Sequence, residues 1–305
     1  MTKKLIYQIL KKFIFSKIII FMFFTSCSTN DDTDKSRIEK IGSRTDYALD
    51  FDGSNDYVNA DNLTGELNSP SGLPFTVQVW AYPETDFSGT STSCTSEREA
   101  VFAFNKTGGS DENRNMLYYA PDGSSQKFWH HGTGNNNCTA SSNSSEPGKW
   151  YHIVMTADSS GNGKLYVNGE QEATYTNGNT SANKFSIGQE YDGSGTTASD
   201  FFDGKIDEVA VWNIALTATD VTTLYNSGNG IKASSNSGNY DNSGDLIGYW
   251  QFNEGTGSTL TDKTLNSNKG TLTNMSSDDW VGSGLSLAEY EYFSHQEWKT
   301  SNVLI

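Results

Sequence analysis

The stretch from Gly204 to Tyr225 constrains the fold most, because a strand-like run leads directly into one short helix. Residues 206–212 are rich in bulky side chains that favour strands. Thr217 and Asp220 then form a capping-box-like start, and apolar side chains follow at helical spacing over residues 221–225. The sequence therefore predicts a strand, a turn and a short helix in immediate succession.

The rest of the chain alternates short apolar runs with turn clusters, which is typical of strands. The predicted strands are Tyr47–Phe51, Phe75–Tyr82, Ala100–Phe104, Asn115–Tyr119, Lys127–His131, Trp150–Ala157, Lys164–Val167, Lys184–Ile187 and Gly204–Trp212. Only 34% of the 305 residues are hydrophobic and 29 are glycine, as expected for short strands joined by many turns. We therefore predict an all-β protein with a single large domain.

Three motifs carry a family resemblance. They are LDFDGSNDYV at Leu49–Val58, WYHIVMTADSSGNGKLYVNG at Trp150–Gly169, and the strand-to-helix stretch at 204–225. Their wording and order resemble laminin-G-like, concanavalin A-type (LamG-like) domains. The resemblance implies a two-sheet antiparallel jelly-roll sandwich over residues 45–282, with one short helix after the closing strand.

Residues 246–282 raise a question of organisation, because LIGYWQFNEGTG at 246–257 resembles a phrase that opens many LamG-like domains, whereas here it comes last. This segment either closes the same sandwich in a permuted way or is the start of a truncated second domain. About 37 residues are too few to build a core alone, which favours closure. No function is assigned to the tail at 283–305.

The first 26 residues contain five lysines, no acidic residue and a short apolar run, the pattern of a signal peptide. Cys27 follows in a context that resembles a bacterial lipobox, so we expect it to be lipidated, with residues 27–44 as a polar tether. The acids after Cys27 resemble the surface-export signal of Bacteroidetes-type lipoproteins. These features predict an outer-membrane lipoprotein exposed at the cell surface; the alternative is an uncleaved membrane anchor.

Charge narrows the choice of partners. Cleavage of the predicted signal peptide would remove its five lysines and leave 16 basic and 37 acidic residues, which gives a net charge near −21. Such a chain repels nucleic acid and anionic lipid surfaces, so no nucleic-acid partner is expected. The acidity suits calcium, neutral sugars or simple solubility.

If Cys27 carries lipid, Cys94 and Cys138 remain as an even pair in an oxidising compartment. We predict that they form a disulfide; the alternative is two free thiols.

Catalysis is not predicted. Glucanases that share the jelly roll carry an E-x-D-x-x-E strand, and this chain has none. Asp207 and Glu208 are adjacent, so on a regular strand they point to opposite faces and cannot act as a pair. The four histidines show no metalloprotease or triad spacing, and the pair His130–His131 is typical of a polar strand end.

Calcium is the predicted cofactor, with a structural role. Hard cations prefer carboxylate and carbonyl oxygens in glycine-containing turns, which the two Asp-Gly motifs supply. The resemblance implies that Asp52 and Asp207 are ligands, with Asp56 and the Gly53 carbonyl as additional candidates. The alternative is that these aspartates only form Asx turns or cap a bulge.

Ligand contact should come from exposed aromatic rings flanked by amide and acid groups. The predicted patch comprises Trp129, Tyr118, Tyr119, His131 and Asn135, in the most idiosyncratic region of the chain. The leading hypothesis is a surface lipoprotein that binds a polysaccharide or other glycan without cleaving it. The alternative is an adhesion or structural module that binds protein, and an enzyme is the third hypothesis.

Overall fold

The computed structural model describes residues 46–67, 71–87, 91–92, 94, 97–108, 113–132, 137–176, 181–192, 196–285 and 287–288. Residues 45–305 form a compact unit of their own. The predicted signal peptide, the tether with Cys27, Asn135 and most of the tail lie outside the described residues.

One antiparallel sheet, sheet A, contains eight strands. Their order is β10 (Glu170–Thr176), β9 (Asn162–Val167), β8 (Tyr151–Ala157), β3 (Phe75–Pro83), β14 (Asp203–Trp212), β1 (Tyr47–Asp52) and β18 (Trp280–Gly282), with β15 (Leu246–Trp250) also paired to β14.

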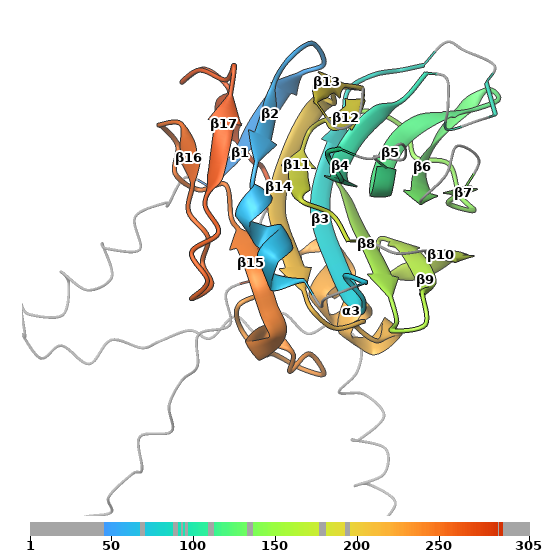
Figure 1. Cartoon of the computed structure of the whole chain (residues 1–305), viewed down its shortest axis with the longest axis vertical. Coiled ribbons are helices and arrows are strands. Elements are labelled where there is room, and N and C mark those ends of the chain that lie inside the picture. Colours follow the sequence, from blue (N-terminus) through green and yellow to red (C-terminus); the bar gives the residue numbers. More distant parts are fainter. Residues whose placement is uncertain are drawn as a thin grey trace, which may run out of the picture. The chain divides into compact units, whose positions relative to one another are not determined.

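The second antiparallel sheet, sheet B, also contains eight strands. Their order is β16 (Thr259–Leu260), β17 (Gly270–Thr273), β2 (Tyr57–Asn59), β11 (Lys184–Ile187), β4 (Glu99–Asn105), β5 (Asn113–Asp122), β6 (Ser125–Gly132) and β7 (Cys138–Ala140). A separate hairpin is formed by β12 (Glu190–Asp192) and β13 (Thr197–Ser199). All nine predicted strands are present, and the predicted two-sheet sandwich is confirmed (Figure 1).

The main core lies between the two sheets and follows the alternation of strand side chains. In β2, for example, Val58 is fully buried against this core, while Tyr57 and Asn59 on either side point outward. Aromatic rings fill the centre: Phe185 lies 4.6 Å from Phe104 and 6.0 Å from Trp250, measured between ring centroids. Burial of these apolar side chains is the main force that holds the sheets together.

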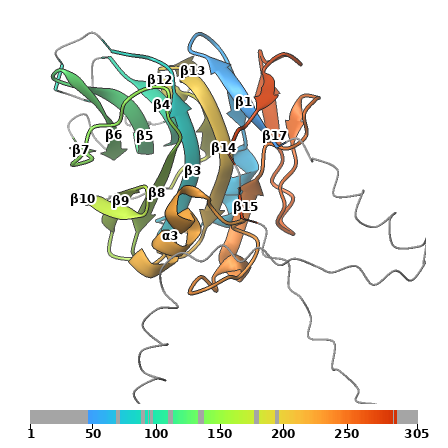
Figure 2. The same cartoon turned by 180° about the vertical axis from the view of Figure 1, so that it is seen from behind.

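Helix α3 (Ala218–Tyr225) covers part of the outer face of sheet A (Figure 2). Its start is the predicted capping box, in which Thr217 and Asp220 each accept a hydrogen bond from the other's backbone N–H. Val221 and Leu224 are buried against Trp212 and its outer-face neighbours. Shorter 3-10 turns occur at Asp61–Glu66 (η1), Asn226–Gly228 (η2) and Ser243–Asp245 (η3).

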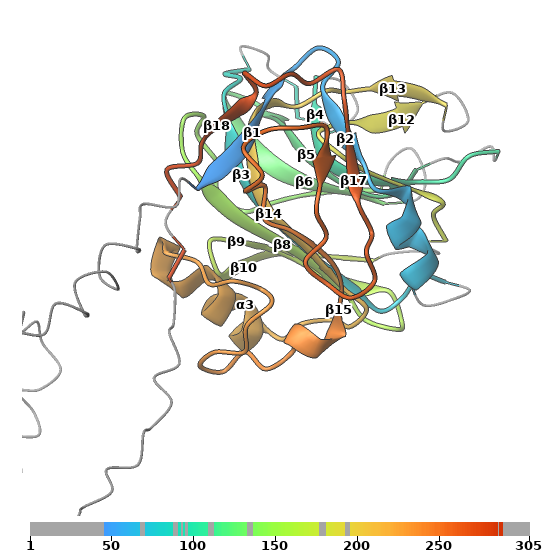
Figure 3. The same ribbon diagram turned by 90° about the vertical axis from the view of Figure 1, so that its left-hand side faces the viewer.

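The last strands add to both sheets of the same sandwich. β15 pairs with β14 and β18 pairs with β1 in sheet A, whereas β17 pairs with β2 in sheet B (Figure 3). Residues 246–282 thus contribute strands to both layers, which a truncated second domain would not do.

Candidate functional site

The predicted ligand patch is not on the surface. Tyr118, Tyr119, Trp129 and His131 are all buried, and none is more than 7% exposed. Tyr119 points into the main core and donates its hydroxyl to the Ser145 carbonyl at 2.8 Å. The expectation of exposed, sugar-stacking rings is therefore wrong for these residues, since protein already covers them.

The other three side chains lie on the outer face of sheet B, where Tyr118 and Trp129 are cross-strand neighbours on β5 and β6. Cys94, from the segment before β4, is buried against this face together with Met116 and Ala103. The predicted disulfide is confirmed: Cys94 is bonded to Cys138 on β7, with 6.3 Å between their Cα atoms. We refer to this covered region, formed by the outward side chains of β4 to β7, as the closed half.

Arg98 fastens the closed half to hairpin β12–β13. Its guanidinium donates to Glu190 at 3.0 Å, to Asp200, and to the Cys94 carbonyl at 3.0 Å, and it lies 4.7 Å from the centre of the Tyr118 ring. Glu190 is the first residue of β12 and Asp200 directly follows β13. A single arginine therefore holds both ends of the hairpin.

Burial dominates the titration of this cluster. It raises the pKa of Glu190, although the neighbouring Arg98 acts in the opposite direction. Burial also raises the pKa of Tyr118 well above its usual range. These groups are part of the packing and are not accessible to a ligand.

The predicted calcium ligands are not brought together. In the β1–β14 pairing Asp52 lies opposite Asp203, and Asp207 is four residues further along β14. At about 3.3 Å per residue this separation is about 13 Å, too far for a shared ion. Asp207 is fully buried and accepts a hydrogen bond from Ser283 at 2.6 Å. The prediction of one calcium site that includes both Asp52 and Asp207 is therefore wrong.

The β1–β2 turn itself is explained by hydrogen bonds. Asp52 accepts bonds from the backbone N–H groups of Ser54 and Asn55, which is an Asx turn. Gly53 has φ of 68°, and a Cβ at this position would lie 3.0 Å from the Asp203 side chain. Asp56 accepts a bond from the Asp52 N–H, and burial together with nearby Asp52 raises its pKa to about 6. Calcium binding at this turn stays a prediction.

Asp207 and Glu208 are unusual because both are buried on one strand. A bulge in β14 places Glu208 at φ of 52°, and its carboxylate accepts a hydrogen bond from the Tyr249 hydroxyl. Burial raises the pKa of both carboxyl groups, and the charge of Glu208 raises the pKa of Asp207 further. Both carboxylates are tied to protein groups, so they contribute to the interior of the fold.

A different part of sheet B presents aromatic rings to solvent. Tyr57 on β2 and Phe201 before β14 are half-buried, and their ring centres are 6.5 Å apart. Tyr191 on β12 lies 6.3 Å from Tyr57, nearly perpendicular to it. These rings border the outward side chains of β17, β2 and β11, and we call this region the open half of the same sheet face.

Hydrogen-bonding groups beside these rings are fixed in place. Asp61 accepts from Lys184 Nζ at 2.7 Å, from Asn59 Nδ2 at 3.1 Å and from the Phe185 N–H at 3.1 Å. Lys184 Nζ also lies 5.5 Å from the centre of the Tyr191 ring. The open half therefore combines apolar ring surface with an oriented acid, amide and ammonium group.

The hairpin separates the two halves. Asn105 on β4 bonds to both the N–H and the carbonyl of Tyr191, so β12 lies across the outer face of β4. From there Glu190 reaches Arg98 in the closed half, and Tyr191 reaches Tyr57 in the open half. Figure 3 shows the hairpin beside β4 and β2.

Sequence reasoning missed the open half because its aromatic residues are scattered along the chain. One signal was available: in β2, Val58 lies between Tyr57 and Asn59, so strand alternation predicts that both point away from a core that contains Val58. Nothing in the sequence indicates that Tyr191 and Phe201 would join them.

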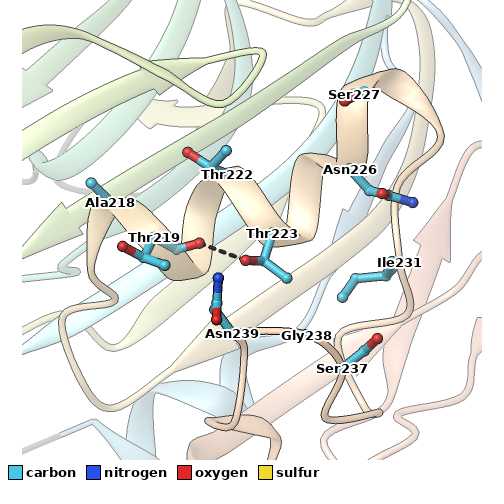
Figure 4. Close-up of a pocket in the computed structure, with 10 residues that line it drawn as sticks. All are labelled: Ala218, Thr219, Thr222, Thr223, Asn226, Ser227, Ile231, Ser237, Gly238 and Asn239. Carbon is cyan, nitrogen blue, oxygen red and sulfur yellow. Dashed lines mark hydrogen bonds between the residues drawn. The ribbon is translucent and has the colours of Figure 1, made fainter. Parts of the chain in front are cut away.

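A hollow of about 510 Å³ lies beside helix α3, as Figure 4 shows. It is lined by Ala218, Thr219, Thr222, Thr223, Asn226, Ser227, Ile231, Ser237, Gly238 and Asn239. None of these ten residues is charged or aromatic. Thr223 donates its hydroxyl to the Thr219 carbonyl at 2.7 Å, and Thr222 donates to the Gly169 carbonyl, so part of the polar lining is already used within the protein.

A family model described as "Concanavalin A-like lectin/glucanases superfamily" matches residues 52–222. The chain belongs to this superfamily. The match begins within the predicted opening motif and ends within α3, and it agrees with the sandwich described above. No match is found among curated proteins.

Several solved structures are similar to this member of the superfamily. A Bacteroides ovatus protein proposed to bind carbohydrate is 19% identical, with a TM-score of 0.49, over 75% of this chain and 58% of that one. A heptameric SAP-like pentraxin from Limulus polyphemus is 20% identical, with a TM-score of 0.47, over 62% of this chain and 85% of that one. Domain 4 of an arabinanase from Geobacillus stearothermophilus, solved with arabinotriose, is 22% identical, with a TM-score of 0.35, over 49% of this chain and 65% of that one. These distant likenesses do not identify a ligand for this chain.

Within the described residues, no helix is both long and apolar enough to cross a membrane.

Proposed function

We propose that this superfamily member binds a neutral glycan, without cleaving it, at the open half of sheet B. The observation that carries the proposal is the placement of half-buried Tyr57 and Phe201 beside the fixed Asp61–Asn59–Lys184 network. Ring faces stack on the apolar faces of sugars, while acid and amide groups bond their hydroxyls. A net charge of −16 disfavours polyanionic ligands.

The test is an array of neutral polysaccharides, including arabinan, xylan, β-glucan and mannan, with alginate as an anionic comparison. The probe is the fragment from Thr45 to Ile305, which contains both sheets and the whole core. Binding to a neutral polymer supports the proposal. If the fragment binds none of these polysaccharides, the alternative is favoured, a module that binds protein or other surface components.

The site is tested by paired variants. Tyr57→Ala should weaken binding at least about tenfold, or 1.4 kcal/mol, as expected for a central aromatic contact. Tyr82→Ala is the matched control, because Tyr82 is also a half-buried tyrosine on a strand, but it lies on β3 of sheet A. Equal losses in both variants would place the binding site elsewhere.

We also propose that lipid on Cys27 anchors the protein to the outer membrane at the cell surface. The support is the basic start, the short apolar run and the acids that follow Cys27. Cys27→Ser should release the protein from the membrane fraction, and protease added to whole cells should digest the wild type. Retention of the variant in membranes would contradict lipid anchoring.

A further inference from the structure

Three possible metal ligands meet at the edge of the closed half. One ligand atom from each of Cys94, His131 and Cys138 lies within 4.8 Å of the others. Among the histidine, cysteine, aspartate and glutamate side chains that the structure describes, this is the single group of three or more with such spacing. In the oxidised protein the two sulfur atoms are bonded to each other.

The backbone fixes two of these side chains. His131 on β6 and Cys138 on β7 are directly opposite one another in an antiparallel pair, which keeps their side chains on the same face at close range. Cys94 is buried in a cluster on this face, and its carbonyl accepts a hydrogen bond from Arg98 at 3.0 Å. With two ligands on paired strands and a third whose carbonyl is held by Arg98, the geometry of the site does not depend on the disulfide alone.

The three side chains suit a soft metal ion. Zn²⁺ binds thiolate sulfur at about 2.3 Å and imidazole nitrogen at about 2.0 Å, so ligands around a tetrahedral ion are about 3.5–3.8 Å apart. The observed spacing accommodates this arrangement after a small adjustment. Two thiolates with one imidazole favour zinc over calcium or magnesium, which take oxygen ligands.

We propose that the reduced form of this domain binds a zinc ion through the sulfur atoms of Cys94 and Cys138 and the imidazole of His131. Reduction by a phosphine breaks the S–S bond, gives two thiols and converts the phosphine and one water molecule to phosphine oxide. Binding of the ion then releases both thiol protons. The metal takes over the crosslink between positions 44 residues apart, and water completes the coordination shell.

This proposal does not rest on glycan binding. Its consequence is that metal restores what reduction removes. The melting temperature of the fragment from Thr45 to Ile305 should fall on treatment with a phosphine and rise again when Zn²⁺ is added, since an ion that binds only the folded state stabilises it. Cys94 and Cys138 are the only cysteines in the sequence of that fragment, so no other thiol contributes.

The direct test uses Co²⁺ as a spectroscopic probe under argon. The reduced wild-type fragment should bind one Co²⁺ with a thiolate charge-transfer band, and Zn²⁺ should displace it. The oxidised fragment and Cys94→Ser should lack the band. His131→Gln should weaken Co²⁺ binding at least about tenfold.

The matched control is His130→Gln. His130 is the neighbouring residue on the same strand, but it is stacked on Tyr175, with ring centres 3.7 Å apart, and it is not among the three grouped side chains. The affinity of the His130→Gln variant for Co²⁺ should equal that of the wild type. Thermal melts establish that each variant is folded. Absence of the band in the reduced wild type, or equal binding by His131→Gln, would overturn the proposal.

Discussion

The two halves of the outer face of sheet B differ in what covers them, although they belong to one sheet and are separated only by hairpin β12–β13. In the closed half, Tyr118 is fully buried in one cluster with Cys94, and Arg98 lies over its ring. In the open half, Tyr57 and Phe201 remain half-buried and pack against each other, and Tyr57 also packs against Tyr191. The same kind of side chain thus serves packing in one half and is accessible to a ligand in the other.

The difference teaches that aromatic content alone does not locate a binding face. A disulfide and an arginine with two carboxylate partners convert the closed half into interior. The open half has an ion pair between Lys184 and Asp61, whose side chains are 29% and 28% exposed, respectively. Among its described residues there is no disulfide. Mutations in the closed half should therefore change stability, and mutations in the open half should change binding.

The largest effect is expected at Arg98. Arg98→Met removes the charged partner of Glu190, whose side chain is fully buried, and leaves its carboxyl group with a 3.4 Å hydrogen bond from Asn105. Breaking a buried pair on one side typically costs about 3–5 kcal/mol, and we expect a loss of that size in urea unfolding. A loss below about 1 kcal/mol would show that the closed half is not held in this way.

Removal of the disulfide should have the next largest effect. Cys94→Ala combined with Cys138→Ala frees a loop with a sequence separation of 44 and should cost about 3–4 kcal/mol in the chain-entropy account. Urea unfolding of the variant against the oxidised wild type measures the loss. Mass analysis of the alkylated, unreduced wild type should find no free thiol at either position; two modified cysteines would refute the crosslink.

A pH effect should follow from Glu99, at the start of β4. Burial raises the pKa of Glu99 from about 4.5 to about 7, although hydrogen bonds from Thr85 and the Asp203 N–H lower it. A raised pKa means that the folded state holds the proton more tightly, so this stabilisation is complete below pH 4.5 and is lost as pH rises to about 7. The loss is on the order of 3–4 kcal/mol.

Glu99→Gln keeps the size of the side chain and removes the titration. The unfolding free energy of the variant relative to the wild type should therefore rise between about pH 4.5 and pH 7 and stay level above that range. A constant difference across this range would show that Glu99 is not a source of the pH dependence.

The sequence was sufficient for local structure and for one long-range bond. Alternation and turn residues located nine strands, Thr217 and Asp220 marked the start of α3, and the even cysteine count indicated the disulfide. Each of these features is encoded by neighbouring residues or by chemistry that leaves few alternatives.

The site was harder to predict because burial and register depend on distant segments. Trp129 is buried in one cluster with Cys94, which comes from a distant part of the chain. The pairing of β1 with β14 sets Asp52 opposite Asp203, and no local pattern distinguishes that register from one that would favour Asp207. The contact between Tyr57 and Phe201 likewise joins residues from distant parts of the chain.

The smallest change in stability is expected at Lys184. Lys184→Met removes its ion pair with Asp61 at 2.7 Å, but both groups remain partly in water, where such pairs contribute about 0–1 kcal/mol. Asp61 keeps its hydrogen bonds from Asn59 and the Phe185 N–H, so the turn that carries it should remain in place. Urea unfolding should therefore show a loss under about 1 kcal/mol, while binding to any neutral polysaccharide found on the array should weaken because an oriented ammonium group is lost. A stability loss near that of Arg98→Met would contradict the distinction between the halves, since the open half would then be held together by its charges as firmly as the closed half.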